Sequence, residues 1–342
     1  MKISVDLTFS VPIWRFFYQD DDKYKIPYEF IYEGKKYTNG ICIIQFGWNI
    51  TEKKLLSDKN FLNEKTLSQN VRNLILCAPN LEILYLLKKY RPKLYCCLAN
   101  HNAFIDENIY KIDYSIEKKF DLIVSSAFSK YKNYHLIKNI QNSCATGYYT
   151  SDTNKTTLPG LKTYCPNFDD KERTKENFKW MDPLTICNYY NMSKIGGIFS
   201  EEEGACFSSS EYLLCGLPVL SCKCQGGREI WYNDTNSILC DPNENSVINK
   251  LNLMLNKYNN GEYDREKIRQ QHIEKMEFHR NSLTSTVMNL LKMITLDLPT
   301  FDELKDSLKY YHSNCRSGMD YVSVNYKNQI IKEKQALKIL EI

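Results

Sequence analysis

The sequence lacks the long apolar segments that would place it in or across a membrane. No run of about 18 apolar residues occurs in the 342-residue chain, which argues against a membrane-spanning helix. The amino-terminal stretch MKISVDLTFSVPIW has neither a clean apolar core nor a small-residue cleavage site, so no signal peptide is expected. We therefore expect a cytoplasmic protein without a transmembrane segment.

The sequence also lacks the cysteine spacings of metal sites, although it contains 13 cysteines. No CxxC pair occurs, and Cys96 and Cys97 are adjacent within an apolar run, so a zinc site is not expected. An odd number of cysteines, scattered through strand-like segments, is typical of buried free thiols in a reducing compartment.

A strong charge of either sign is missing as well. The 45 basic and 41 acidic residues leave a net charge of +4, and no concentrated basic face is evident, which argues against a nucleic-acid partner. No Asp-x-Asp motif suited to a metal–diphosphate site stands out, because the acidic runs at 20–22 and 169–170 lie in polar, loop-like segments. We expect no bound metal and no cofactor.

What is present is an alternation of strand-like and helix-like segments. The length suits two domains of about 150 residues each. Near-continuous apolar strands alternating with helices predict parallel sheets covered on both faces. Strands are expected at 1–9, 40–48, 93–100, 121–127, 195–200 and 217–222. Helices are expected at 80–90, 128–140, 183–194, 208–216, 245–258, 265–280, 300–314 and 328–340.

The stretch from about 145 to 180 interrupts this alternation, because it is polar and rich in turn-forming residues. We place the domain junction at its start. The predicted organisation is an amino-terminal domain over 1–145, a second domain over 146–300, and carboxyl-terminal helices over 301–342.

The segment GGIFSEEEGACFSSSEYLLCGLPVLS, residues 196–221, predicts a strand, a loop and a short helix. A hydroxyl of Ser208 or Ser209 can cap the helix, and Glu211 would then lie in its first turn, where the helix dipole favours an acid. Gly216 suits the position just after the helix, and the proline that follows prevents continuation.

The loop of this segment is expected to bind an anion. In an open α/β sheet, ligands bind outside the carboxyl ends of the strands, which is where this loop lies. The N–H groups of Gly204, Ala205, Cys206 and Phe207 would face an anion such as a diphosphate, and Gly204 would allow a close approach of the backbone.

The same segment resembles the donor-site motif of group-1 glycosyltransferases, the family-4 type with a GT-B fold. The resemblance is carried by Glu203-Gly204, by Glu211 eight residues after the first acid, by CGLPVLS, and by CQGGREIWYNDTNSILCDP downstream. It implies that Glu203 contacts the hydroxyls of the donor sugar and that Glu211 binds the ribose of the nucleotide. It leaves Glu201 and Glu202 as loop residues.

The resemblance extends more weakly to other parts of the chain. His101, in CCLANHNAF, matches a family histidine at the end of an amino-domain strand, which implies a catalytic position facing the donor sugar. Arg173 and Lys175 are the best candidates for the basic pair that grips the diphosphate, although their spacing is shorter than usual. Lys162 and Arg228 remain alternatives for this task. The glycine-rich loop that usually follows the first strand is missing.

The resemblance implies a GT-B architecture, with two Rossmann-like domains facing across a cleft and carboxyl-terminal helices packing back on the amino-terminal domain. It implies a retaining, metal-independent hexosyltransferase that moves a sugar from a nucleotide diphosphate sugar to a hydroxyl acceptor, such as a glycan or glycoprotein in glycan biosynthesis. The alternatives are a glucosyltransferase acting on modified nucleic-acid bases and a non-catalytic GT-B-like protein that binds a nucleotide or glycan.

Overall fold

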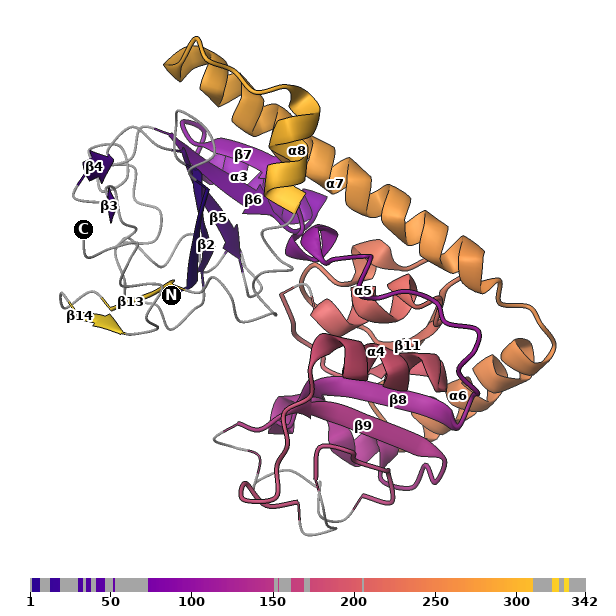
Figure 1. Ribbon diagram of the computed structural model, residues 1–342. Helices are drawn as coiled ribbons and strands as arrows, with labels where there is room; N and C mark the ends of the chain where they lie inside the picture. Colours follow the sequence, from indigo (N-terminus) through magenta and orange to yellow (C-terminus); the bar gives the residue numbers. More distant parts are fainter. Residues whose placement is uncertain are drawn as a thin grey trace. The chain divides into compact units, whose positions relative to one another are not determined.

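The chain forms two compact units in the computed structural model (Figure 1), unit 1 over Met1–Ile105 with Met276–Ile342 and unit 2 over Asp106–Lys275. The structure describes residues 2–6, 13–18, 30–32, 35–37, 41–46, 52, 73–150, 153, 161–168, 173–204, 206–309, 322–325 and 329–331. Among these residues, no helix is both long enough and apolar enough to cross a membrane.

Unit 1 is built on a seven-stranded sheet in the order β14-β13-β1-β2-β5-β6-β7. The strands from β2 to β7 in this order run parallel to one another, whereas β1 is antiparallel to both of its neighbours. Every residue of β5 and β6 is buried, as expected for strands covered on both faces. The elements are β1 (Lys2–Asp6), β2 (Ile13–Tyr18), β3 (Phe30–Tyr32), β4 (Lys35–Tyr37), β5 (Ile41–Phe46), β6 (Leu74–Ala78), α3 (Leu81–Tyr90), β7 (Tyr95–Leu98), η1 (His101–Phe104), β13 (Val322–Asn325) and β14 (Gln329–Ile331).

The end of the chain also belongs to unit 1. The second part of α7 (Arg265–Ile294) and α8 (Phe301–Lys309) lie in this unit. The guanidinium of Arg280 donates hydrogen bonds to the carbonyls of Ala103 and Ile105, the latter at 3.2 Å, which fixes α7 to the segment after β7. The helix predicted at 328–340 is wrong in its first part, because residues 329–331 form β14 beside β13.

Unit 2 contains a five-stranded sheet in the order β12-β11-β10-β8-β9, with all neighbouring strands parallel. Adjacent residues of β10 face opposite sides of this sheet: Gly196 faces Tyr212 of α5, and Ile195 packs in a core cluster with Leu251 of α6. Helices therefore cover both faces. The elements are β8 (Phe120–Ala127), η2 (Lys130–Lys132), η3 (Tyr134–Ile137), β9 (Ser143–Tyr148), α4 (Pro183–Asn191), β10 (Ser193–Ile198), α5 (Phe207–Leu214), β11 (Val219–Cys222), η6 (Glu229–Trp231), β12 (Ser237–Cys240) and α6 (Glu244–Asn259).

The predicted domain boundary at 145 differs from this division. β8, which we had assigned to the first domain, pairs with β10, as in the partners Leu122 and Ile195. The polar stretch after residue 145 connects β9 to α4 within unit 2, so its turn-rich composition marks a long connection and not a boundary. The return to unit 1 also begins earlier than predicted, at Met276 within α7.

The helix predicted over 128–140 is replaced by two short 3₁₀ turns, η2 and η3. Asn133, between them, adopts a left-handed conformation with φ 54°, which an α-helix cannot accommodate. Its side-chain amide donates to the carbonyl of Phe199 at 3.0 Å. This bond connects the segment after β8 to the segment after β10.

Candidate functional site

The candidate site lies at the carboxyl ends of β8 and β10. In chain order the strands of unit 2 are arranged 2-1-3-4-5, so the direction of strand addition reverses between β8 and β10. Ligands of open parallel sheets bind at the carboxyl side of such a reversal. The two segments that leave the sheet at this point contain Lys132 and Glu203.

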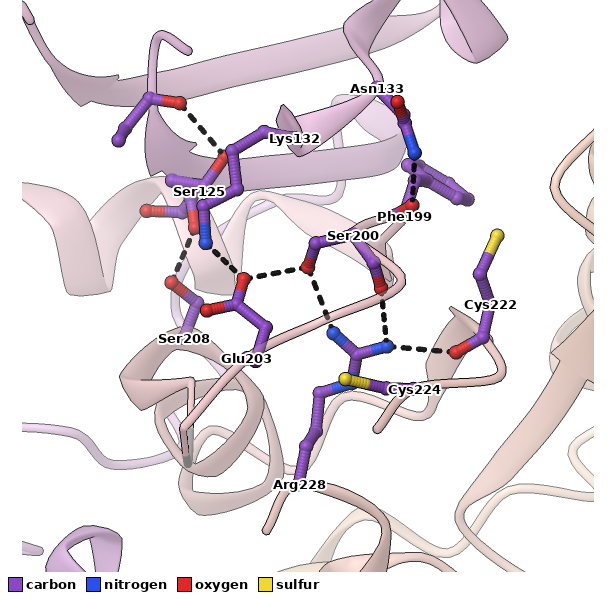
Figure 2. Close-up of polar contacts among 12 residues, drawn as sticks. Ser125, Lys132, Asn133, Phe199, Ser200, Glu203, Ser208, Cys222, Cys224 and Arg228 are labelled. Atoms are coloured by element: carbon purple, nitrogen blue, oxygen red, sulfur yellow. Dashed lines mark hydrogen bonds and ion pairs between the residues drawn. The ribbon is translucent and has the colours of Figure 1, made fainter. Parts of the chain in front are cut away.

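Lys132 and Glu203 form a buried ion pair (Figure 2). The Nζ atom of Lys132 contacts Oε1 of Glu203, and the two side chains are only 9% and 7% exposed. Oε1 of Glu203 also accepts a hydrogen bond from the Ser200 hydroxyl at 2.6 Å. The carboxylate is thus positioned by one cation and one hydroxyl.

The pair keeps a full charge on Lys132. Burial alone would lower the pKa of the ammonium group, but the negative charge of Glu203, smaller effects of Cys206 and Tyr131, and the hydrogen bond to Glu203 together raise the pKa above its ordinary value. The Nζ atom also lies 4.8 Å from the ring centroid of Tyr131. Burial raises the pKa of Tyr131 to about 12, so this phenol stays neutral.

Arg228 holds the end of β10 in place. This fully buried guanidinium donates to the Ser200 hydroxyl at 3.0 Å, to the Ser200 carbonyl at 2.9 Å and to the Cys222 carbonyl at 2.8 Å (Figure 2). Because Ser200 in turn donates to Glu203, Arg228 orients the carboxylate indirectly. The contacts that the structure describes therefore give Arg228 a positioning task.

The loop that carries Glu203 is paired with the glycine-rich turn after β11. The N–H of Glu203 donates to the carbonyl of Gln225 at 3.1 Å, and the N–H of Gly227 donates to the carbonyl of Gly204 at 2.6 Å. Gly226 lies between these bonds with φ +138°, and a Cβ atom there would stand 1.8 Å from the carbonyl oxygen of Glu203. Only glycine fits this position.

Helix α5 begins without the predicted serine cap. The residue before it, Cys206, is in a left-handed conformation with φ 55° and makes no side-chain capping bond. The Ser208 hydroxyl instead donates to the Ser125 carbonyl of β8, and the Ser209 hydroxyl donates to the Tyr232 hydroxyl at 2.9 Å. The serines thus bind neighbouring segments in place of capping the helix.

The predicted end of α5 is confirmed. Gly216 has φ +67°, its N–H donates to the Leu213 carbonyl at 3.0 Å, and the N–H of Leu217 donates to the Tyr212 carbonyl at 2.9 Å. These two bonds form a Schellman motif, which requires a residue such as glycine in the left-handed region.

Glu211 lies inside unit 2 and not in the first turn of α5. It is the fifth residue of the helix, is 1% exposed, and accepts a hydrogen bond from the Tyr190 hydroxyl at 2.6 Å. The Tyr190 hydroxyl also lies 2.9 Å from the hydroxyl of Ser125. The prediction of a first-turn acid is wrong because the helix begins at Phe207, earlier than a serine cap would allow.

The other predicted residues differ in their surroundings. His101 is buried in η1 of unit 1, where the preceding Asn100 caps the turn. Arg173 is buried and donates hydrogen bonds to the carbonyls of Leu161 and Thr163, at 3.2 and 2.7 Å. These bonds fix the backbone of residues 161–163. Lys175 is exposed.

In the loop after β10, Glu201 and Glu202 are exposed, as expected for loop residues, whereas Glu203 is buried. Ala205 lies outside the described residues. Among the residues that are described, no cluster of three or more His, Cys, Asp or Glu side chains could hold a metal ion.

Sequence reasoning missed Lys132 and Ser200. A signal for Lys132 was present, since FSKYKN follows a continuous apolar strand and places two lysines just past its carboxyl end. Because a helix was predicted over this segment, Lys132 was not predicted to lie at the edge of the sheet. Ser200 gave no signal, because its importance depends on Arg228, which lies 28 residues away in the sequence.

Comparisons with known proteins identify the fold. No protein-family model matches the sequence, and no curated protein matches it either. Among solved structures, a point mutant of S. aureus TarM in complex with fondaparinux, α-GlcNAc-glycerol and UDP is similar, with a TM-score of 0.50 and 14% identity. That match covers 74% of this chain and 51% of TarM, so the chain spans about half of the TarM length.

Two further solved structures are similar with lower scores. Anabaena HepE in complex with UDP has a TM-score of 0.47 and 14% identity, over 70% of this chain and 73% of HepE. Sucrose-phosphate synthase from Thermosynechococcus elongatus has a TM-score of 0.45 and 12% identity, over 82% of this chain and 69% of that protein. The five parallel strands of unit 2 and the four parallel strands β2, β5, β6 and β7 of unit 1, taken with the TarM match, give the chain the α/β GT-B fold class that the sequence predicted.

Proposed function

We propose that the chain is a glycosyltransferase that moves a sugar from a nucleotide diphosphate sugar to a hydroxyl of a glycan acceptor, with retention and without a metal ion. The observation that carries the proposal is the buried Lys132–Glu203 pair at the reversal point of the parallel sheet. The presence of UDP in the TarM complex supports a nucleotide as the ligand.

The ion pair suits a ligand that carries both a polyanion and hydroxyl groups. A diphosphate can take the place of the Glu203 carboxylate beside Lys132, and the released carboxylate can accept hydrogen bonds from sugar hydroxyls. As the bond between sugar and diphosphate breaks, negative charge grows on the departing phosphate. Lys132 would stabilise that charge in a site largely closed to water.

The remaining assignments stay predictions within this proposal. Glu211 would bind the ribose, the N–H groups from Gly204 to Phe207 would face the diphosphate, and His101 would act on the sugar. Arg228 would act through Ser200, because its described bonds are to Ser200 and Cys222.

The test compares the two acids by calorimetric titration with nucleoside diphosphate alone. A hydrogen bond to a charged group contributes about 1.5–3 kcal/mol, roughly a tenfold to hundredfold change in affinity. Glu211→Gln should weaken binding by that factor. Glu203→Gln should bind the nucleotide no more weakly than wild type but lose turnover, because its sugar contact is absent from the free nucleotide.

Glu202→Gln is the matched control, since this neighbouring acid is exposed and should leave both binding and turnover unchanged. Hydrolysis of the donor sugar in the absence of acceptor separates an enzyme from a protein that only binds. If Glu203→Gln and Glu211→Gln both behave as wild type in binding and turnover, the proposed function is wrong.

A further inference from the structure

Two exposed aromatic rings stack beside the candidate site. Tyr148 and Trp180 have ring centroids 6.3 Å apart and planes only 5° from parallel. The two residues are 46% and 75% exposed. An exposed, parallel aromatic pair is costly to leave in water and is a common stacking surface for flat ligands.

The Tyr148–Trp180 pair, which we call the platform, packs against further aromatic residues. Trp180 meets the ring of Phe178 edge-on, with centroids 5.4 Å apart and an interplanar angle of 81°. Phe178 in turn packs against the buried rings of Phe128 and Phe168, at 6.5 and 5.6 Å. A ligand that stacks on this surface would therefore find Trp180 already oriented, which reduces the entropic cost of binding.

The platform is continuous with the ion pair. Tyr148 is the last residue of β9 and pairs with Ala127, the last residue of β8, from which the chain leads directly to Lys132. The N–H of Phe128 donates to the Tyr148 carbonyl at 2.9 Å. The ring of Tyr131 lies under the Lys132 ammonium, and the nearby Tyr148 phenol makes a small contribution to the raised pKa of Tyr131.

We propose that Tyr148 and Trp180 form the stacking platform for the base of the nucleotide whose diphosphate Lys132 receives. The inference rests on the proposed function and names the part of the donor that this surface holds. A cation and an exposed aromatic surface at one sheet edge suit a ligand in which a planar group is joined to a polyanion, as in a nucleoside diphosphate. Because every base has a π-face, the platform contributes affinity without choosing the base.

The experiment measures the affinities of UDP, GDP, ADP and inorganic pyrophosphate for wild type, Trp180→Ala and Tyr148→Ala. Stacking of one base changes affinity by a factor of roughly 5 to 100. Trp180→Ala should weaken the nucleoside diphosphates by such a factor and leave pyrophosphate unchanged. Trp180→Phe should restore most of the loss.

Tyr164→Ala is the matched control. Tyr164 is 52% exposed and stacks on Phe120 with centroids 5.7 Å apart and planes 10° from parallel. Phe120 is the first residue of β8, so this pair lies at the opposite end of the strand that leads to Lys132. Its removal should change none of the four affinities.

Two results would overturn the inference: unchanged nucleotide affinity in Trp180→Ala, or an equal loss of affinity for pyrophosphate. Lys132→Gln separates this failure from failure of the proposed function. If wild type binds nucleotides and Lys132→Gln does not, the nucleotide site on which the proposed function depends stands, whatever happens at Trp180.

Discussion

The two ends of the five-stranded sheet in unit 2 each contain a lysine, Lys132 buried and Lys118 partly buried, and the two lysines differ in charge. At the carboxyl end, Glu203 keeps Lys132 protonated. At the amino end, Lys118 donates to the Ser193 carbonyl at 2.6 Å, and burial, with a smaller effect of Arg265, lowers the pKa of Lys118 to about 7. A buried cation thus persists where the fold supplies a carboxylate, and this occurs at the end where ligands of such sheets bind.

Lys132→Gln should have the largest effect on stability of the substitutions considered at the two ends of this sheet. The substitution leaves the Glu203 carboxylate buried without its cation, which should lower the free energy of unfolding by about 3–5 kcal/mol. The double variant Lys132→Gln/Glu203→Gln should recover most of that loss, because neither charge is then left unpaired. Urea denaturation of the single and double variants measures both effects. If Lys132→Gln were as stable as wild type, the Lys132–Glu203 pair would be exposed to water and would contribute nothing to stability.

A second substitution tests the loop that presents Glu203. Gly226→Ala places a methyl group against the Glu203 carbonyl in a backbone region that only glycine adopts easily, and should cost about 2–3 kcal/mol of stability together with turnover. Gly261→Ala is the matched control, because Gly261 has φ +73° but no atom within 4 Å of the added carbon. That variant should lose roughly 1 kcal/mol and keep its activity. Thermal unfolding and a donor-hydrolysis assay distinguish the two.

Substitution of Lys118, at the amino end of the sheet, should have the smallest effect on stability, and it should stabilise the protein. Lys118 has a pKa of about 7 in the folded protein and about 10.4 when unfolded, so the unfolded chain binds more protons between these values. The contribution of Lys118 to stability therefore rises with pH across this window, and its cost is fully present below pH 7. Because Lys118 is only partly buried, Lys118→Met should stabilise the protein at pH 7 by roughly 1–2 kcal/mol.

The measurement for Lys118→Met is urea denaturation of variant and wild type at pH 7 and pH 9.5. The difference between the two proteins should shrink at the higher pH, because folded wild-type Lys118 has then lost its proton while the unfolded chain, with a pKa of about 10.4, still largely retains it. A difference that is absent at pH 7, or that grows with pH, would contradict the pKa assigned to Lys118.

The sequence predicted those features that depend on local pattern. Alternating strands and helices were found in unit 2, and Gly216 was correctly placed at the end of α5, because periodicity and turn chemistry act over a few residues. Glu201 and Glu202 were expected to be loop residues and are exposed, whereas Glu203, chosen by its spacing before Glu211, is buried.

Features that depend on distant segments were missed. Lys132 pairs with Glu203 across 71 residues, and this contact exists only because β8 lies beside β10. The predicted domain boundary differs from the division into units for the same reason, since nothing local distinguishes a long connection inside a unit from a junction between units. Arg228 was an alternative for the residue that grips the diphosphate, but its bonds to two backbone carbonyls are visible only in the folded structure.

The pairing of Lys132 with Glu203 has a consequence for proton exchange with the buffer. Because the carboxylate raises the pKa of Lys132, the lysine already holds its proton before any ligand arrives. A diphosphate bound as proposed would find that proton in place, and Lys132 would take up none from solution. Lys132 therefore makes no contribution to any dependence of the calorimetric binding heat on the ionisation enthalpy of the buffer.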